Sequence, residues 1–390
     1  MPEHAVIVDV VRTPVGRGKV GGGLSSVHPA DLLAGQLEAL VRRSDLDPAL
    51  VEDVVVGCAQ QVGEQAGNIG RNAVLGAGFP ESVPSTTLNR QCGSSQQAAA
   101  FVAQAIMAGS HDIAIAAGVE SMSVVPIGSS RPSSAGARAE ARYAAGLVNQ
   151  GVAAELVAER WKLSRAELDA YAAESHRRAG QGWSDGFFDD EVVAVPEALD
   201  LATDETVRPG TTAAGLAGLR PSFRTDEMAA RFPDVDWKIT PGNSSPLTDG
   251  ASAALIMSER RALALGLRPR ARFHAFTVVG DDPLMMLTGP IPATEKILTR
   301  TGLRIDDIDA YEVNEAFAPV PLAWAAEFRA DPVRLNPRGG AIALGHALGS
   351  SGTRLLATLV NHLEATGGRY GLQTMCEAGG MANATIIERL

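Results

Sequence analysis

The chain has 390 residues, 45% hydrophobic and 20% charged, a composition typical of a globular enzyme. This length predicts two or three domains. The formal net charge of −11, without a run of Lys and Arg or a basic-aromatic stripe, argues against nucleic-acid binding. Three cysteines are too few for a disulfide framework, and no Cys or His residues have metal-ligand spacing. We therefore expect no metal and no permanently bound cofactor.

The amino-terminal sequence, MPEHAVIVDVVRTP, lacks the basic stretch and apolar block of a signal peptide. The chain also has no run of about 18 apolar residues, which a membrane-spanning helix requires. We therefore expect a cytoplasmic protein that does not insert into membranes.

Hydrophobic patterning predicts alternating strands and helices in the first 120 residues. A polar stretch precedes Cys92, and a helix of small and apolar residues follows it. The expected strands are Val6–Val11, Val54–Gly57 and Asp112–Gly118, and the expected helices are Pro29–Val41 and Ser95–Ala108.

The carboxyl-terminal part of the chain repeats this order of elements. Cys92 and His346 are 254 positions apart, and the same separation relates Asp53, beside an early strand, to Asp307. The repetition predicts two similar βαβ-rich halves with Cys92 and His346 at equivalent positions, each at a helix N-terminus. The expected elements here are strands at Ala271–Val279, Tyr370–Cys376 and Ala384–Glu388, helices at Pro292–Arg300 and Thr353–Glu364, and the segment Ile305–Val313, which matches the early strand.

The region between the halves is rich in Ala, Gly, Ser, Arg and Asp, with one clear helix at Ser164–Gly180. Ser164 and Glu167 have the spacing of a capping box at the start of that helix. Scattered Trp and Phe residues favour an inserted lid or loop domain over a disordered linker. We therefore predict an N-terminal half of residues 1–120 and 250–269, an inserted loop domain of residues 121–249, and a C-terminal half of residues 270–390.

Cys92 is the first candidate for chemistry because it begins a predicted helix in the sequence NRQCGSSQQ. Unpaired N–H groups and the positive end of the helix dipole lower the pKa of a thiol at such a place. The glycine that follows allows a substrate to approach closely. The alternative is a buried, inert cysteine, but the polar flanks and the glycine favour a nucleophile.

Three further residues could support such a nucleophile. Gly-rich sequence surrounds His346, whose imidazole could accept the thiol proton or donate Nε2–H to a carbonyl oxygen, although it could also be structural. Cys376 ends a predicted strand before a glycine turn and could equally be a core cysteine. Asn314 follows a strand end, where it could instead be a helix N-cap.

Six motifs occur in one order across nearly the whole chain: NRQCGSSQQA, AAGVESMS, NSSPLTDGASA, YEVNEAFA, GGAIALGHALGSSG and TMCEAGG. This series closely resembles that of the thiolases, which include acetyl-CoA acetyltransferases and 3-ketoacyl-CoA thiolases. The resemblance implies an α/β fold in which two βαβ-rich halves form a five-layer α-β-α-β-α core with an inserted loop domain. It also implies acyl-CoA substrates, CoA as co-substrate, and a homodimer or homotetramer.

The resemblance implies a role for each matched residue. Cys92 would carry the acyl group. His346 would activate it and help bind the thioester oxygen, and Asn314 would hold a water in that oxyanion hole. Cys376 would move a proton to and from the acetyl-CoA α-carbon or the CoA thiol. The backbone N–H groups of Cys92 and Ala378 would form a second oxyanion hole.

The resemblance also implies substrate contacts. Ser245 matches a serine that touches the pantetheine of CoA, and Met286 a methionine near the acyl pocket. Arg208 matches an arginine near the nucleotide end of CoA, and its alternative is a solvated surface arginine.

The sequence departs from the family pattern at three places. Most thiolases have proline where Ala347 follows the histidine, and glycine where Ala378 stands two residues past the second cysteine. The short-chain biosynthetic members commonly carry a His-Met pair near residues 149–151, which here read Asn-Gln-Gly, so acetoacetyl-CoA specificity is doubtful. The ending MANATIIERL and the segment NRQCGSSQQ look more like actinobacterial thiolases of lipid and sterol side-chain breakdown.

We therefore predict a degradative 3-ketoacyl-CoA thiolase that works through an S-acyl cysteine. One alternative is a non-catalytic acyl-CoA-binding homologue, against which the retained Cys92, Asn314, His346 and Cys376 argue. A second is a condensing synthase of the same superfamily, which typically lacks an equivalent of Cys376. A third is a redox sensor, for which the sequence offers no evident resolving cysteine.

Overall fold

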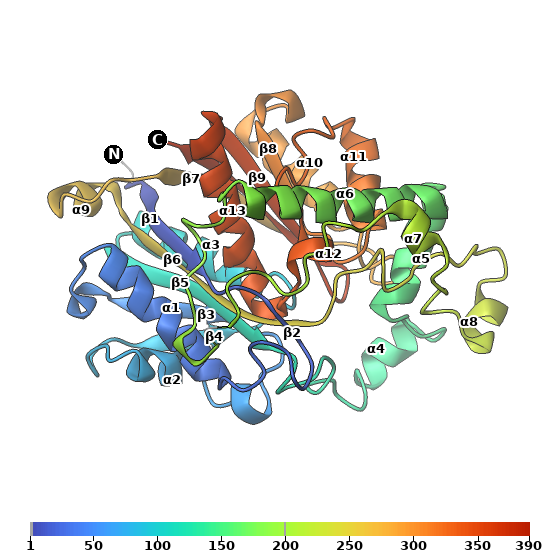
Figure 1. The fold of residues 1–390 in the computed structure, drawn as a ribbon, viewed down its shortest axis with the longest axis horizontal. Coiled ribbons are helices and arrows are strands. Elements are labelled where there is room, and N and C mark those ends of the chain that lie inside the picture. The colour runs from blue at the N-terminus through green and yellow to red at the C-terminus, as the bar shows by residue number, and fades with distance from the viewer. Residues whose placement is uncertain (1–2, 199) are drawn as a thin grey trace.

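The computed structural model describes residues 3–198 and 200–390, which form the α/β fold shown in Figure 1. None of the helices in this part of the chain combines the length and the apolar character that a membrane span requires. The strands are β1 (Ala5–Arg12), β2 (Gly16–Arg17), β3 (Asp53–Gly57), β4 (Ser85–Leu88), β5 (Ile113–Ser121), β6 (Thr248–Ser258), β7 (Ala271–Gly280), β8 (Ala310–Val313), β9 (Tyr370–Glu377) and β10 (Met381–Arg389).

The helices include every one that the sequence predicted, with ends that differ by a few residues. They are α1 (Pro29–Arg43), α2 (Ile69–Gly76), α3 (Ser94–Met107), α4 (Ala137–Arg142), α5 (Gln150–Arg160), α6 (Arg165–Ser184), α7 (Ala213–Ala217), α8 (Asp226–Arg231), α9 (Glu259–Ala264), α10 (Pro290–Thr301), α11 (Pro319–Phe328), α12 (Ala341–Leu344) and α13 (Ser351–Thr366). Short 3₁₀ helices span Pro48–Leu50, Gly63–Gln65, Pro196–Ala198, Ile305–Asp307 and Leu348–Ser350.

The strands form one ten-stranded sheet in the order β4-β3-β5-β6-β1-β7-β10-β9-β8, with β2 paired to β6. β3 is parallel to β4 and β5, and β8 is parallel to β9, whereas the other pairings are antiparallel. The sheet consists of an amino-terminal half-sheet, β4 to β1 in this order, and a carboxyl-terminal half-sheet, β7 to β8. The two half-sheets meet at β1 and β7, where only Val6 and Ile7 pair with Arg272 and Ala271. Each half of the chain therefore supplies one continuous run of strands.

Helices cover both half-sheets and also separate them. α1 and α2 pack on the amino-terminal half-sheet, and α10 packs on the carboxyl-terminal one and against α11. α3 and α13 pack on each other and on strands of both half-sheets, with Ala98, Val102, Leu356 and Leu359 in their shared core. The layers thus follow the predicted order α-β-α-β-α, with α13 prominent near the centre of Figure 1.

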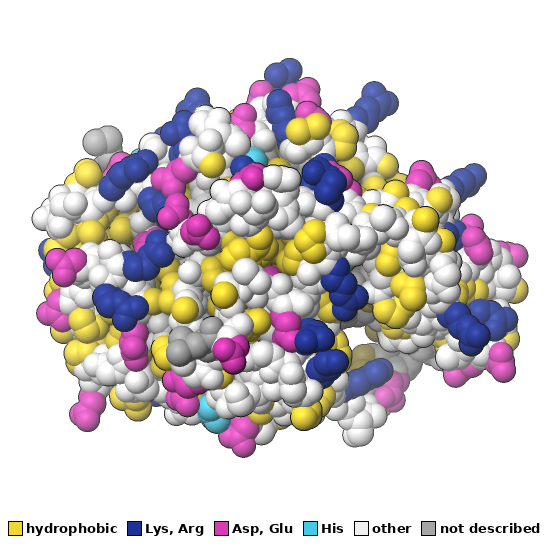
Figure 2. All heavy atoms as spheres, in the orientation of Figure 1, with side chains coloured by type: hydrophobic (Ala, Val, Ile, Leu, Met, Phe, Trp, Pro, Cys, Tyr) yellow, Lys and Arg dark blue, Asp and Glu magenta, His cyan; other side chains and the backbone are white. Residues whose placement is uncertain are grey.

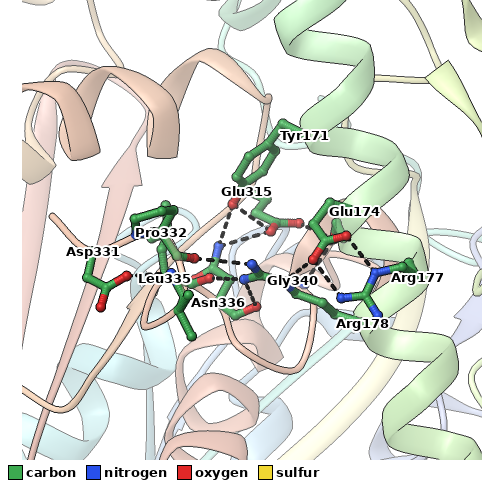
Figure 3. A network of polar contacts seen from close by, with 12 residues as sticks. Tyr171, Glu174, Arg177, Arg178, Glu315, Asp331, Pro332, Leu335, Asn336 and Gly340 are labelled. Atoms are coloured by element: carbon green, nitrogen blue, oxygen red, sulfur yellow. Dashed lines mark hydrogen bonds and ion pairs between the residues drawn. The ribbon is translucent and has the colours of Figure 1, made fainter.

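The residues between β5 and β6 hold α4 to α8. The predicted capping box starts α6, because the Ser164 backbone N–H donates to Glu167 Oε2 (2.7 Å) and the Glu167 N–H donates to Ser164 Oγ (3.2 Å). Figure 3 shows Tyr171 of α6 beside Glu315 of the carboxyl-terminal half, to whose Oε1 it donates (2.8 Å). Ser175, also on α6, donates to Glu315 Oε2 (2.7 Å). The division into three parts itself stays a prediction.

Two segments differ from their predictions. β6 was not predicted, because its small residues (TDGASAALIMS) are buried on both faces and show no alternation of polar and apolar side chains. Only the end of Ile305–Val313 is a strand, because the segment begins with a 3₁₀ turn. The Asp307 carboxylate closes this turn by accepting the Arg304 N–H (2.8 Å).

The starts of α3 and α13 lie backbone against backbone. A β-carbon added to Gly118 would overlap the carbonyl oxygen of Gly349, and one added to Gly352 would overlap the backbone N of Gln96. Only glycine permits these distances. The contact holds the segment before α13 against the start of α3 and the end of β5.

We expect Gly118→Ala to lower the free energy of unfolding by about 1–3 kcal/mol, because the added methyl group overlaps backbone that cannot move aside. Urea unfolding followed by circular dichroism measures this change. The matched control is Gly35→Ala within α1, where the added β-carbon meets no atom within 4 Å. That variant should be more stable by about 0.5–1 kcal/mol. Equal stability of Gly118→Ala and the wild type would contradict the prediction.

Candidate active site

The predicted site residues gather around one cavity of about 650 Å³. Its lining includes Cys92, His346, Ala378, Ser245 and Met286. Asn314 and Cys376 are buried rather than part of the lining. Arg208 lines a second cavity of about 540 Å³, which shares Phe223 and the segment 244–247 with the first.

Cys92 lies between β4 and α3, directly before Gly93, the N-cap of the helix. Its side chain is 4% exposed and packs with Met122, Leu348 and Met375. Burial raises the pKa of the Cys92 thiol well above its usual range, and the nearby Cys376 and carboxylates raise it further. The sequence predicted that the helix N-terminus lowers this pKa, whereas burial in the folded chain raises it.

His346 does not begin α13 as predicted, because the 3₁₀ helix Leu348–Ser350 intervenes. Its Nδ1 lies 2.7 Å from Ser351 Oγ, and that hydroxyl donates to the Ala347 carbonyl (2.9 Å). A hydroxyl has one proton to donate, so Ser351 accepts from Nδ1–H and Nε2 keeps its lone pair. Burial lowers the pKa of His346 to about 3, which leaves the imidazole neutral.

Glu120 holds the two sides of the site together, and sequence reasoning missed it although it lies in the quoted motif AAGVESMS. Its buried carboxylate accepts the backbone N–H groups of Ala59 and Gln60 after β3, at 2.9 and 3.0 Å. It also accepts the N–H of Gly349 (2.9 Å), from the loop that carries His346. The histidine loop is therefore anchored to the strand ends of the other half.

Asn314 follows β8, and its backbone N–H donates to Thr374 O (3.1 Å). The Asn314 amide nitrogen lies 3.4 Å from His346 Nε2, and its Oδ1 is buried without a hydrogen-bond partner. Cys376 is on β9, where burial raises the pKa of its thiol to about 12. Both residues thus lie behind the cavity, beside the groups that face it.

The site can perform acyl transfer. A neutral imidazole with an unprotonated Nε2 can take a proton from a neutral thiol as that thiol attacks a carbonyl carbon. Among described residues, the backbone N–H groups of Cys92 and Ala378 donate to no other residue, so they can receive an oxyanion. No group of three or more His, Cys, Asp or Glu in the described ranges could hold a metal ion. Fold and site together define an acyltransferase.

The comparisons with known proteins name the family. Residues 5–260 match the model "Thiolase, N-terminal domain", and residues 267–389 match "Thiolase, C-terminal domain". The chain therefore belongs to the thiolase family, as its motifs predicted, and is an acyltransferase.

The relatives match over nearly their full length. The steroid 3-ketoacyl-CoA thiolase FadA6 of Mycobacterium tuberculosis is 47% identical, over 99% of this chain and 94% of that protein. A 3-ketoacyl-CoA thiolase of Serratia proteamaculans is 44% identical over 100% of both chains. The crystal structure of the Bacillus anthracis acetyl-CoA acetyltransferase superposes with a TM-score of 0.88 at 34% identity, covering 100% of this chain and 99% of that one.

Because the resting Cys92 is a neutral thiol, we expect its alkylation by iodoacetamide to accelerate about tenfold per pH unit from about pH 6 to pH 9, without a plateau. Only the thiolate reacts, and its fraction rises with pH towards the raised pKa. The rate is measured from the labelled Cys92 peptide by mass spectrometry. A rate already constant near pH 6 would show a preformed thiolate–imidazolium pair and contradict the prediction.

Proposed function

We propose that this chain cleaves 3-ketoacyl-CoA substrates with CoA, through an S-acyl intermediate on Cys92. The observation that carries the proposal is the meeting of Cys92, His346 and Ala378 at one cavity that adjoins a second one lined by Arg208. The printed names of the relatives support the same reaction. CoA is then a co-substrate, and no permanently bound cofactor takes part.

The first half-reaction uses both cysteines. His346 Nε2 takes the proton of Cys92 as its sulfur bonds to the 3-keto carbon, and the oxyanion is held by the N–H groups of Cys92 and Ala378. The bond between carbons 2 and 3 then breaks. The enolate oxygen of the departing acetyl-CoA accepts from His346 Nε2–H and from a water on Asn314, while Cys376 protonates carbon 2. The buried, unpaired Oδ1 of Asn314 is suited to hold that water.

The second half-reaction restores every proton. The Cys376 thiolate takes the proton of the incoming CoA thiol, whose sulfur attacks the acyl carbon on Cys92. The same two N–H groups receive the oxyanion. The carbon–sulfur bond to Cys92 breaks, and His346 returns its proton to that sulfur. Each oxyanion-hole donor typically contributes about 3–4 kcal/mol to transition-state stabilisation.

The second cavity is suited to the phosphates of CoA. Arg208 and Lys19 line it, and no described carboxylate lies within 4 Å of either side chain. Ser245, which lines both cavities, would lie along the pantetheine between the two ends. Figure 2 shows basic side chains beside a hollow between the main body and the region of α4 and α5.

The acyl pocket supports a substrate larger than acetoacetyl-CoA. Val148, Asn149, Gln150 and Gly151 line the cavity. Phe223 packs on Gly151 so closely that a β-carbon there would overlap its ring. Val148, Phe223 and Met286 contribute apolar side chains to this wall, which supports the acyl group of a lipid or of a sterol side chain as substrate. A cytoplasmic location, a homodimer or homotetramer, and the division into two halves and a loop domain are part of the same proposal.

We expect Cys92→Ala to lower thiolysis at least about 10³-fold, because it removes the sulfur that carries the acyl group. The assay follows loss of the 3-ketoacyl-CoA enolate absorbance with CoA, across short, long and sterol-derived chains. The matched control is Cys58→Ala, a buried cysteine outside the cavity lining, which should retain activity. Wild-type inactivity with every substrate, together with tight CoA binding, would favour the non-catalytic homologue.

We expect Arg208→Gln to raise KM for CoA about 5- to 10-fold with kcat unchanged, because one charge-assisted contact to a phosphate is lost in both ground and transition states. Steady-state kinetics at fixed 3-ketoacyl-CoA measures this split. Arg268→Gln is the control, since that side chain is exposed and far from either cavity lining. An unchanged KM for CoA would identify Arg208 as a solvated surface residue.

A further inference from the structure

The side chain of Gln60 connects the strand ends of the core to a surface segment. Gln60 follows β3, is 6% exposed and contributes to the lining of the catalytic cavity. Its Oε1 accepts two backbone N–H groups, from Gly128 (2.9 Å) and Ser130 (3.1 Å). One amide oxygen thus holds two points of a segment nearly 70 positions further along the chain.

The core end of this connection is rigid. The Gln60 N–H donates to Glu120 Oε1 (3.0 Å), and the Gln60 carbonyl accepts from Gln65 Nε2 (2.9 Å). Glu120 is the carboxylate that also receives the N–H of Gly349 from the histidine loop. Gln60 is therefore positioned by the same group that positions the loop of His346.

The surface end has little other support. Residues 127–132 are exposed on their outer side, and Ile127, Gly128, Ser130, Arg131 and Pro132 line the cavity. Their remaining hydrogen bonds are internal: Ser129 donates to Pro126, and Arg131 donates to Gly128. Within the described residues, Gln60 is the only residue outside 126–131 that hydrogen-bonds to this segment.

The position of the segment in the cavity indicates which part of the substrate it meets. The cavity adjoins the basic cavity along residues 244–247, on the side where CoA would lie. Gln60, Ile127, Gly128 and residues 130–132 line the catalytic cavity and not the basic one, as do Cys92 and Met122. Their wall therefore faces the acyl group.

We propose that Gln60 is a specificity-determining positioning residue, which holds residues 127–132 as a wall of the acyl pocket. This role rests on the proposed thiolase function. A small acyl group bound at Cys92 does not need this wall, whereas a long or bulky one packs against it. Loss of the two hydrogen bonds should therefore affect substrates according to the size of their acyl group.

The kinetic test compares Gln60→Met, which has similar length but no acceptor oxygen, with Gln60→Glu, which keeps the acceptor. We expect Gln60→Met to raise KM about 10-fold for a long or bulky 3-ketoacyl-CoA. The shortest substrate that the wild type accepts should change less than about twofold. Gln60→Glu should restore most of the loss. Gln61→Met is the matched control, because Gln61 donates to Cys58 O (3.0 Å) and not to the segment. Equal effects on short and bulky substrates would overturn the proposal.

Amide hydrogen exchange tests whether Gln60 holds residues 127–132 without requiring an activity measurement. We expect the amides of Gly128 and Ser130 to exchange about 10-fold faster or more in the Gln60→Met protein, with unchanged exchange in Gln61→Met and slow exchange again in Gln60→Glu. Unchanged protection of those two amides in Gln60→Met would overturn the proposal. Wild-type inactivity on all substrates would instead refute the thiolase function, and the exchange result would still decide whether Gln60 holds the segment.

Discussion

The backbone of α13 and its preceding loop touches the start of α3 and the end of β5, and the catalytic arrangement depends on this contact. Gly118, Gly349 and Gly352 permit distances that any β-carbon would prevent. Because each helix follows its catalytic residue, closing this contact brings Cys92 and His346 from opposite halves to one cavity. The proposed nucleophile and its proposed base therefore meet only because this contact forms between the two halves.

The same burial determines the protonation states. Removing Cys92 and His346 from water raises the pKa of the thiol and lowers that of the imidazole, so the resting pair is neutral. Ser351 then orients the free Nε2, and Glu120 fixes the loop through backbone N–H groups. A neutral thiol and a neutral imidazole avoid the free-energy cost of burying two charges. In the proposed reaction, negative charge forms on an oxygen that lies beside preorganised N–H donors.

Buried carboxylates help attach the region between β5 and β6 to the rest of the chain, together with isolated backbone bridges at Arg12–Val192 and Ser244–Phe317. Glu315 accepts from Tyr171 and Ser175 of α6 (Figure 3), and it also accepts the N–H of Ile342 (3.1 Å) in α12, just before His346. Gln60 attaches residues 127–132 in a similar way, because its side-chain oxygen accepts two of their backbone N–H groups. Polar groups fully satisfied inside the protein fix one geometry, because any displacement leaves a buried donor or acceptor unpaired.

The sequence by itself determined the strands and helices that have a clear hydrophobic pattern, the repeat that relates Cys92 to His346, and the family, because hydrophobic periodicity, glycines and local motifs lie in continuous stretches of the chain. It also predicted Cys92 and His346 as partners. The tertiary structure alone decided that β6 lies inside the sheet, that Cys92 is a neutral thiol, and that Ser351, Glu120 and Gln60 orient the site. Burial and hydrogen bonds between residues far apart in the chain set these features, and neither is encoded in any local pattern.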